Sequence, residues 1–472
     1  MAHSSTPEHQ DDGAIGASDS PPESGAQGGR PEPLGRSFHA HLGTVALANL
    51  ADGILMAGVP LIAVSLTRSP QEISLLTALF WLPWLIFGLI AGVVIDRTDR
   101  RRLRILALTV RVAVLLGVVG IAVAGAMSIE VLIVFMGLYG LTQVFADMAG
   151  RTMIPQVAPS SRLAAANGRT MAAEQVFNDF IGPPAAGLLV VLGAGWVLGV
   201  PTAVCVGAVL VLVFGLRGDY RAGRRGGIGP VAGDPSGRAP AQESGAADAG
   251  GFRELFDGIR IVWSHPVLRP VVIMSCVANL ATTAHHSVFI LWVVGEESAI
   301  GLTASQYPLF AVASAVGAIV ASFVVEHLKR SISELPLMLG SFLALAPLML
   351  LPVLLPRFDV LLLTGLLQGF LGMTGNVIAM TMIQRLTPEK QLGRVIGAVT
   401  SAGFGLMPIG ALAGGVVGEH LGLPVVFLSA AVLLSSAVAY PMLRINRRLT
   451  EEGAAEHREA CAPEAESRHS PQ

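Results

Sequence analysis

The chain has 472 residues, of which 52% are hydrophobic and only 14% are charged. Soluble globular chains carry about 25% charged residues, so this composition excludes an ordinary soluble protein and indicates a polytopic membrane protein. The formal net charge of −2 gives no reason to expect nucleic acid as a partner. The three cysteines, Cys205, Cys276 and Cys461, are scattered, which excludes a disulfide framework or a cysteine metal cluster.

Polar tails enclose a long apolar region. Residues 1–36 and 445–472 are rich in small, polar and acidic residues, so we expect both tails to be disordered. A bilayer span needs roughly 20 apolar residues. Runs of this kind, without the alternation typical of a membrane β-barrel, predict an all-α polytopic membrane protein. The twelve predicted spans are approximately 40–66, 71–95, 103–126, 129–153, 167–192, 195–216, 268–294, 304–326, 334–355, 358–383, 395–418 and 423–443.

The loops between the spans differ in positive charge, and the difference predicts their orientation. The loops on one side carry only Arg68 and Arg357, whereas those on the other side carry all the remaining clusters of arginine and lysine. Basic loops stay in the cytoplasm. We therefore expect a multi-pass protein of the bacterial cytoplasmic membrane with both termini in the cytoplasm.

The longest internal connection, residues 217–267, separates six spans from six. Its first part is rich in glycine, proline and arginine, which is typical of a flexible linker. Its second part places apolar residues from Phe252 to Trp263 at helical spacing, so we expect an amphipathic helix over 252–264 along the inner membrane surface. The predicted domains are an N-terminal half, 37–216, and a C-terminal half, 268–444.

The two halves share an internal repeat. VAPSSRLAAANGRT at 157–170 aligns with LTPEKQLGRVIGAV at 386–399, and VIDRTDR at 94–100 has a weaker copy, VVEHLKR, at 324–330. Together these matches indicate duplication of a six-helix unit. Transporters built from such parallel halves bind their substrate between the halves, near the membrane midplane.

Short motifs indicate a family. GVVIDRTDRRR at 92–102 follows the second span, and GPPAAG at 182–187 interrupts the fifth. The first resembles the signature between helices 2 and 3 of the major facilitator superfamily, and the second resembles the Gly-Pro motif of its antiporters. GIRIVWSHPVLRP at 258–270 and LTPEKQLGRVIGA at 386–398 resemble its macrolide-efflux and enterobactin-exporter branch. The resemblance implies the twelve-helix fold of that superfamily, in two pseudo-symmetric six-helix halves, and small-molecule transport by alternating access.

The charged residues near the inner ends of the helices form an expected gate. By the resemblance, Asp96 lies at the N-terminus of the eleventh span, where a carboxylate gains about 0.3–1 kcal/mol from the helix dipole. That contact would latch the outward-facing state. Asp147 and Arg151 have the i, i+4 spacing of an ion pair. The expected gating residues are Gly92, Asp96, Arg97, Arg100, Arg101, Asp147, Arg151 and the weaker copy Glu326 and Arg330.

Ionisable residues inside the membrane are functional candidates, because each costs about 2.5–3.5 kcal/mol at the midplane. We expect three of them, Asp52, Asp179 and Glu174, to take part in proton coupling, with Asp179 the best carrier; the alternative is that neighbouring helices satisfy them structurally. Asp179 lies just before the break formed by the antiporter-motif residues Gly182, Pro183, Pro184 and Gly187.

Three other ionisable residues leave two interpretations each. Arg111 either snorkels to the cytoplasmic surface or pairs with an acid, Asp52 or Asp147. His285 and His286 either titrate near neutral pH or lie near the outer interface.

Several polar and aromatic residues are candidates for the substrate cavity. The two tryptophans flank a proline in the middle of the second span and form either a cavity wall or lipid-facing packing, while the amides either bind substrate or bridge helices. The cavity candidates are Asn49, Trp81, Trp84, Gln143, Gln175, Asn178, Gln368 and Asn376.

The sequence contains no GxxxxGK[ST] motif and no metal-ligand cluster, so we expect no ATP, no metal, no cofactor and no enzymatic activity. We expect a monomeric, proton-coupled exporter of an amphipathic small molecule, such as an antibiotic, drug or siderophore. Its partners are then the substrate, protons and the lipid bilayer. An importer of a small metabolite on the same fold and a non-transporting membrane receptor are the alternatives.

Overall fold

The computed structural model describes residues 34–216, 218, 220 and 250–444. Within these residues, 12 helices are long and apolar enough to cross a membrane, which confirms the predicted fold class. Most of both predicted tails and the first part of the predicted linker lie outside the described residues. The helices are α1 (Arg36–Val64), α2 (Pro70–Arg97), α3 (Arg100–Val123), α4 (Ile129–Val157), η1 (Ser160–Arg162), α5 (Leu163–Gln175), η2 (Val176–Ile181), α6 (Gly182–Leu192), α7 (Ala194–Gly215), α8 (Gly250–Ser264), α9 (Leu268–Val293), α10 (Pro308–Ser331), α11 (Glu334–Leu354), α12 (Phe358–Leu386), α13 (Glu389–Leu421) and α14 (Leu423–Arg444).

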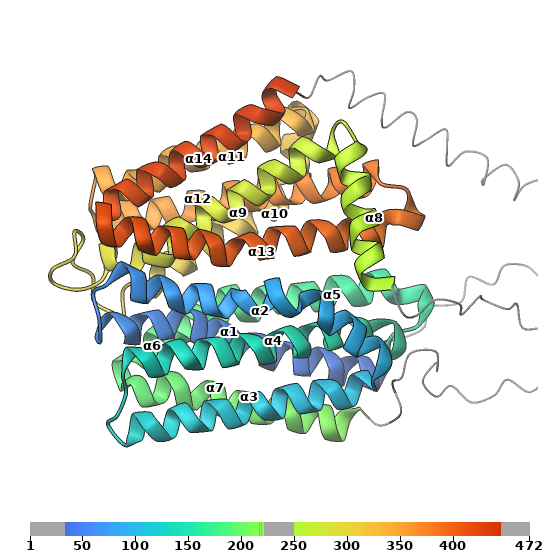
Figure 1. Ribbon diagram of the computed structural model, residues 1–472, viewed down its shortest axis with the longest axis horizontal. Helices are drawn as coiled ribbons and strands as arrows, with labels where there is room; N and C mark the ends of the chain where they lie inside the picture. Colours follow the sequence, from blue (N-terminus) through green and yellow to red (C-terminus); the bar gives the residue numbers. More distant parts are fainter. Residues whose placement is uncertain (1–33, 217, 219, 221–249, 445–472) are drawn as a thin grey trace, which may run out of the picture.

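The helices pack in two groups, α1–α7 and α9–α14, which lie one above the other in Figure 1. In the first group α1 packs on α6 and α7, and α2 and α3 pack on α4. In the second, α12 packs on α10 and α11, and α14 packs on α9. The largest contact between the groups joins α2 to α13. We call the end of the bundle with the α2–α3 loop and α8 the arginine-rich end, and the other end the opposite end.

At the arginine-rich end, α8 lies across the two groups (Figure 1) and packs against α13, α9 and α2. Gly258 faces α13 so closely that a Cβ there would lie 2.3 Å from the carbonyl oxygen of Arg394. Asp257 and Arg394 form an ion pair of 3.8 Å beside this contact. On α8, Trp263 is exposed, and the Arg269 guanidinium stacks on its ring. The helix α8 thus covers the residues of the predicted amphipathic helix and packs closely against α13 at Gly258.

The α2–α3 loop is fixed to its own group of helices. Arg100 donates a hydrogen bond of 2.9 Å to the carbonyl of Thr152 in α4, and Arg101 donates one of 3.0 Å to the carbonyl of Val213 in α7. Asp99 is the N-cap of α3 and accepts from a backbone N–H in its first turn. Asp99, the second acid of the motif, thus has a structural role. Aspartate is a preferred N-cap residue, so the sequence could have indicated this role.

The fifth span consists of three pieces, α5, η2 and α6. Pro183 and Pro184 have no N–H group, so the α-helical hydrogen-bond ladder cannot continue through them. The chain forms a π-helical segment directly before them, in which the Gly182 N–H donates to the carbonyl of Phe177, five residues back. The proline break therefore shapes the segment that carries Asp179.

The two groups of helices are joined at the opposite end. Arg68 donates a hydrogen bond of 2.7 Å to the carbonyl of Val294, at the C-terminus of α9. Ser69, the N-cap of α2, donates one of 2.6 Å to Glu419 near the end of α13. Among hydrogen bonds whose two partners are both described, all that connect the two groups lie at this end.

Candidate substrate and proton site

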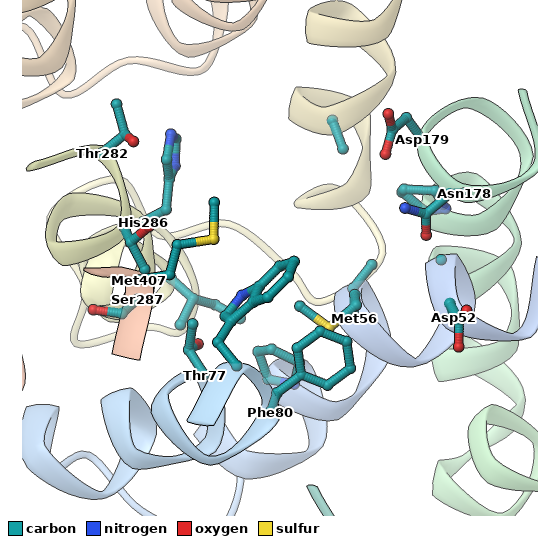
Figure 2. Close-up of a pocket in the computed structure, with 18 of the residues that line it drawn as sticks. Asp52, Met56, Thr77, Phe80, Asn178, Asp179, Thr282, His286, Ser287 and Met407 are labelled. Atoms are coloured by element: carbon teal, nitrogen blue, oxygen red, sulfur yellow. The ribbon is translucent and has the colours of Figure 1, made fainter. Parts of the chain in front are cut away.

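A cavity of about 510 Å³ lies between the two groups of helices. Figure 2 shows that Asp52, Asn178 and Asp179 form one side of it, while Thr282, His286 and Ser287 of α9 lie on the other. Aromatic and thioether side chains form much of the apolar lining: Met56, Phe80, Trp81, Tyr307, Phe310 and Met407. The cavity thus combines an apolar wall with two carboxyl groups.

Two glycines bring the carboxyl groups together. A Cβ on Gly53 would lie 2.2 Å from the carbonyl oxygen of Asn178, and a Cβ on Gly182 would lie 2.5 Å from the Cα of Gly53. Neither position has room for a side chain, so α1 touches the fifth span backbone to backbone. This contact puts Asp52 and Asp179 on one wall of the cavity.

Asp52 is buried and ion-paired. Its Oδ1 accepts hydrogen bonds from Arg111, at 3.1 Å, and from the Tyr139 hydroxyl, at 2.5 Å. The Arg111 guanidinium also stacks on the Tyr139 ring and donates to the Thr142 hydroxyl. Of the two interpretations of Arg111, the structure shows pairing with Asp52, because a buried guanidinium needs an anionic partner.

Asp179 has a different environment. It lies half-buried in η2, and the Gln175 side-chain amide donates a hydrogen bond to it from one turn earlier. Among the described residues, no cationic side chain forms an ion pair with Asp179. Protonation of Asp179 would therefore break no ion pair among the described residues, whereas protonation of Asp52 would remove the negative charge that pairs with Arg111.

The two neighbouring histidines have separate positions. His286 lines the central cavity. His285 is buried in the core, where its Nε2 lies 3.3 Å from the carbonyl oxygen of Met349 and its ring packs against Phe289 and Phe427. His285 is therefore a core residue, whereas His286 is exposed in the cavity.

Of the other cavity candidates, some line the cavity and some do not. Trp81 lines the cavity and stacks on Phe404 of α13 at 5.3 Å, and Gln143 and Asn178 also line it. Trp84 packs edge-on against Phe404, at the contact between the two groups of helices. Five cavity candidates lie outside the described lining: Asn49, Trp84, Gln175, Gln368 and Asn376. The proton-coupling candidate Glu174 also lies outside it. The sequence did not single out the hydroxyls Thr77, Thr282, Thr283 and Ser287.

The antiporter-motif residues serve packing as well as the cavity. Pro183 lines the cavity. Gly187 lies against α10 of the other group, where a Cβ would approach Pro308 to 2.7 Å. Together with Gly182, which packs on α1, the motif forms close contacts on both sides of the fifth span.

The expected gating residues include one wrong pairing. Arg151 forms its ion pair with Glu174 of α5, at 3.4 Å, and the predicted pair with Asp147 does not form, although both residues line the same small pocket. Spacing along α4 allowed the pair, but it did not reveal that a second acid on α5 faces Arg151.

The remaining gating residues are placed only in part. Glu326 pairs with Lys329 one turn later, at 3.1 Å, and Arg330 is exposed. Arg97 is exposed at the end of α2. The surroundings of Gly92 and the side chain of Asp96 lie outside the described part of the structure. The contact of Asp96 with the N-terminus of the eleventh span therefore stays a prediction.

Two groups of helices around a central cavity, with carboxyl groups inside the membrane, define a secondary transporter. Residues 42–357 and 287–464 match the family description "Major Facilitator Superfamily". The chain belongs to this family and is a multi-pass membrane transporter rather than an enzyme.

The chain is similar to named relatives along most of its length. It is 25% identical to the "Multidrug efflux pump Tap" of Mycolicibacterium fortuitum over 412 residues, which cover 84% of this chain and 93% of the relative. It is 26% identical to the "Uncharacterized MFS-type transporter y4rN" of Sinorhizobium fredii over 388 residues, which cover 79% and 86% of the two chains. The first of these matches agrees with the resemblance to efflux-type members.

Solved structures share the fold. An auto-inhibited peptide transporter of the POT family superposes with a TM-score of 0.65 at 14% identity, covering 88% of this chain and 97% of that one. A bacterial homologue of the iron transporter ferroportin, in an inward-facing state, gives a TM-score of 0.62 at 15% identity, with coverage of 86% and 99%. At these identities the similarity concerns the fold alone.

Proposed function

We propose that the protein exports a neutral or cationic amphipathic small molecule in exchange for protons. The observation that carries this proposal is the composition of the central cavity, in which Asp52 and Asp179 share a wall with aromatic side chains. Among the described lining residues there is no lysine or arginine. An anion would have no cationic partner there, whereas a lipophilic cation would find both a carboxylate and aromatic rings.

The size of the cavity supports a drug-sized substrate. Its volume of about 510 Å³ lies within the roughly 300–1,000 Å³ typical of small-molecule sites. Met56 and Met407, with their flexible side chains, line it beside Trp81. Thioether groups adapt to differently shaped ligands, which favours a broad substrate range.

The proton mechanism follows from the different partners of the two acids. Asp179, without a salt bridge, can bind either a proton or the cationic part of a substrate. Binding of one then excludes the other, which is the thermodynamic requirement for exchange transport. Asp52 stays paired with Arg111 until a proton replaces that interaction, so we assign Asp179 as the primary carrier and Asp52 as a second, coupled site.

Direction and orientation form the next part of the proposal. The basic loops at the arginine-rich end support its placement in the bacterial cytoplasm, with both termini there. The hydrogen bonds of Arg68 and Ser69 to the other group of helices hold the opposite end together, in support of a state that is closed to the outside. Transport would require residues 37–216 and 268–444 to rock as two halves about the cavity. The relative named as a multidrug efflux pump supports export.

The experiment measures ethidium movement in everted membrane vesicles that contain the protein. We expect proton-driven uptake of ethidium into the vesicles, collapse of the gradient by a protonophore, and loss of uptake in Asp179→Asn. Glu130→Gln, which changes an exposed acid near the start of α4, should transport as the wild type does. Accumulation of substrate by intact cells would favour the importer. A lack of flux for ethidium and for a panel of neutral and anionic compounds would favour the receptor.

A further inference from the structure

A second, smaller cavity lies inside the first group of helices, between α1, α3, α4 and α5. It has about 10 Å³ for the centre of a water molecule, which is room for about one water. Its lining is polar and charged, in contrast to the aromatic wall of the central cavity: it includes His41, Asn49, Arg104, Asp147, Thr170 and Glu174. A cavity of this composition inside a helix bundle needs an explanation, because buried polar groups are costly.

Buried polar atoms without partners surround this cavity. His41 and Arg104 are both buried, and Arg104 Nη1 lies 3.0 Å from His41 Nδ1. Two further atoms of these residues, His41 Nε2 and Arg104 Nε, have no hydrogen-bond partner in the structure. The same holds for Asp52 Oδ2 and Arg111 Nη2, one layer nearer the membrane centre. Ordered water satisfies such groups in proteins, typically with about three hydrogen bonds each.

The small cavity lies on the arginine-rich side of Asp52. Asn49 lines it and lies one turn of α1 before Asp52. Asp147 interacts electrostatically with Asp52 and also with Arg111. At the other end, Glu174 is 26% exposed and pairs with the more exposed Arg151. Three acids therefore lie along one polar layer: Asp52 is nearest the membrane centre, Asp147 lies in the middle, and Glu174 is nearest the arginine-rich end.

We propose that water in this cavity, together with Asp147 and Glu174, carries protons between Asp52 and the arginine-rich end. The path lies within the α1–α7 group and is separate from the substrate cavity. This inference rests on the proposed proton coupling and adds the route to it. A proton leaves the neutral Asp52 carboxyl, passes through water to the Asp147 carboxylate, and moves on through Glu174 to bulk water. Asp52 ends as a carboxylate, while Asp147 and Glu174 each gain and lose one proton and return to their initial state.

The charged groups around the path fit this sequence of steps. When Asp52 becomes neutral, the Arg111 guanidinium keeps its contacts with the Tyr139 ring and the Thr142 hydroxyl. Arg104 lines the cavity together with Asp147 and Glu174, and its positive charge favours the ionised form of both acids between proton transfers. His41 and Tyr139 complete the titratable groups that face the layer from α1 and α4.

The test follows the protonation of Asp52 directly, without a transported substrate. Infrared difference spectra of the purified full chain are recorded after a rapid pH jump, and the Asp52 carboxyl band is assigned by its loss in Asp52→Asn. We expect Glu174→Gln and Asp147→Asn to slow the response of this band by about 100-fold, the usual effect of removing one positioned proton-transfer group. Glu130→Gln should respond at the wild-type rate.

A further variant blocks the path without changing a charge. A Cβ on Gly150 would lie 2.9 Å from the guanidinium carbon of Arg104, so Gly150→Ala adds a methyl group beside the cavity and displaces Arg104. It should also slow the response. Wild-type rates in Glu174→Gln, Asp147→Asn and Gly150→Ala would overturn the inference, as would the absence of a titrating Asp52 band. Slowing by Asp179→Asn alone would assign the route to the central cavity and overturn it too. Failure of proton-driven ethidium transport with a normal Asp52 response would instead contradict the proposed function.

Discussion

The interiors of the two groups of helices differ in one respect, which is buried charge. Among the described residues, the buried charged side chains are Asp52, Asp99, Arg104 and Arg111, and all four lie in the α1–α7 group. The interior of α9–α14 buries hydroxyls and His285 instead. The two groups thus differ in their chemistry: among the described residues, the first buries acids and arginines, and the second does not.

The ion pairs of the second group confirm this contrast. Lys329 and Arg385 both contact Glu334, at 3.5 Å and 2.8 Å, and join the ends of α10, α11 and α12. All three side chains are partly exposed at the arginine-rich end. Exposed pairs of this kind contribute little to stability, with a median of about 0–1 kcal/mol. The buried pair of Asp52 and Arg111 in the first group differs, because removing one partner leaves an unpaired buried charge at a much larger cost in stability.

The largest predicted effect separates the two walls of the central cavity. Asp179→Asn should reduce proton-driven ethidium flux to the background of empty vesicles, because its amide cannot exchange a proton. Binding of ethidium should persist at a reduced affinity. On the facing wall, His286→Gln should retain proton-driven flux. Flux in everted vesicles and equilibrium dialysis measure the two quantities, and proton-driven flux at the wild-type level in Asp179→Asn would remove this residue from the mechanism.

The next effect concerns stability. Arg111→Ala leaves Asp52 buried without its cation and should lower the free energy of unfolding by about 3–5 kcal/mol. Arg385→Ala, in the exposed pair of the second group, should lower it by less than about 1 kcal/mol. Thermal unfolding in detergent compares the variants. Equal losses in the two would show that the contrast in buried charge has no energetic meaning.

A smaller effect is predicted for the core of the second group. His285→Ala removes a ring packed between Phe289 and Phe427 and should destabilise the protein by about 2 kcal/mol, within the usual range for core substitutions. The pH dependence of transport should stay that of the wild type, because His285 acts by packing. A shifted pH profile in His285→Ala would give the second group a share of the proton chemistry.

The smallest effect is predicted at the surface. Glu326→Gln removes one exposed partner of Lys329, which still contacts Glu334, so the change in unfolding free energy should stay below about 0.5 kcal/mol. Distance measurements between spin labels at the arginine-rich end would show whether the inward/outward balance also stays unchanged. A large shift in that balance would mean that this weaker copy of the motif is a gate in its own right.

The sequence predicted the fold well for a physical reason, because only long apolar helices fit a bilayer and their runs are visible directly. The same cost of polar groups in lipid pointed to Asp52 and Asp179, and both line the central cavity. Side-chain partners were harder to predict. Arg151 pairs with Glu174 of α5. The spacing of residues within α4 cannot reveal a contact with another helix.

Other site residues gave no distinctive signal. His41 and Arg104 lie near helix ends, where basic residues are common for topological reasons. The cavity hydroxyl of Thr282 donates to the carbonyl of Ala278 in its own helix, as threonines do anywhere in a membrane span. Their roles depend on which helices face each other, and that information is tertiary.

The most direct test of the central claim, that the α1–α7 wall carries the exchangeable proton, is the number of protons released when ethidium binds to the purified protein. Calorimetric titrations in two buffers of different ionisation enthalpy give this number. We predict proton release in the wild type and an equal release in His286→Gln, but none in Asp179→Asn. Undiminished release in Asp179→Asn, or its loss in His286→Gln alone, would contradict the account.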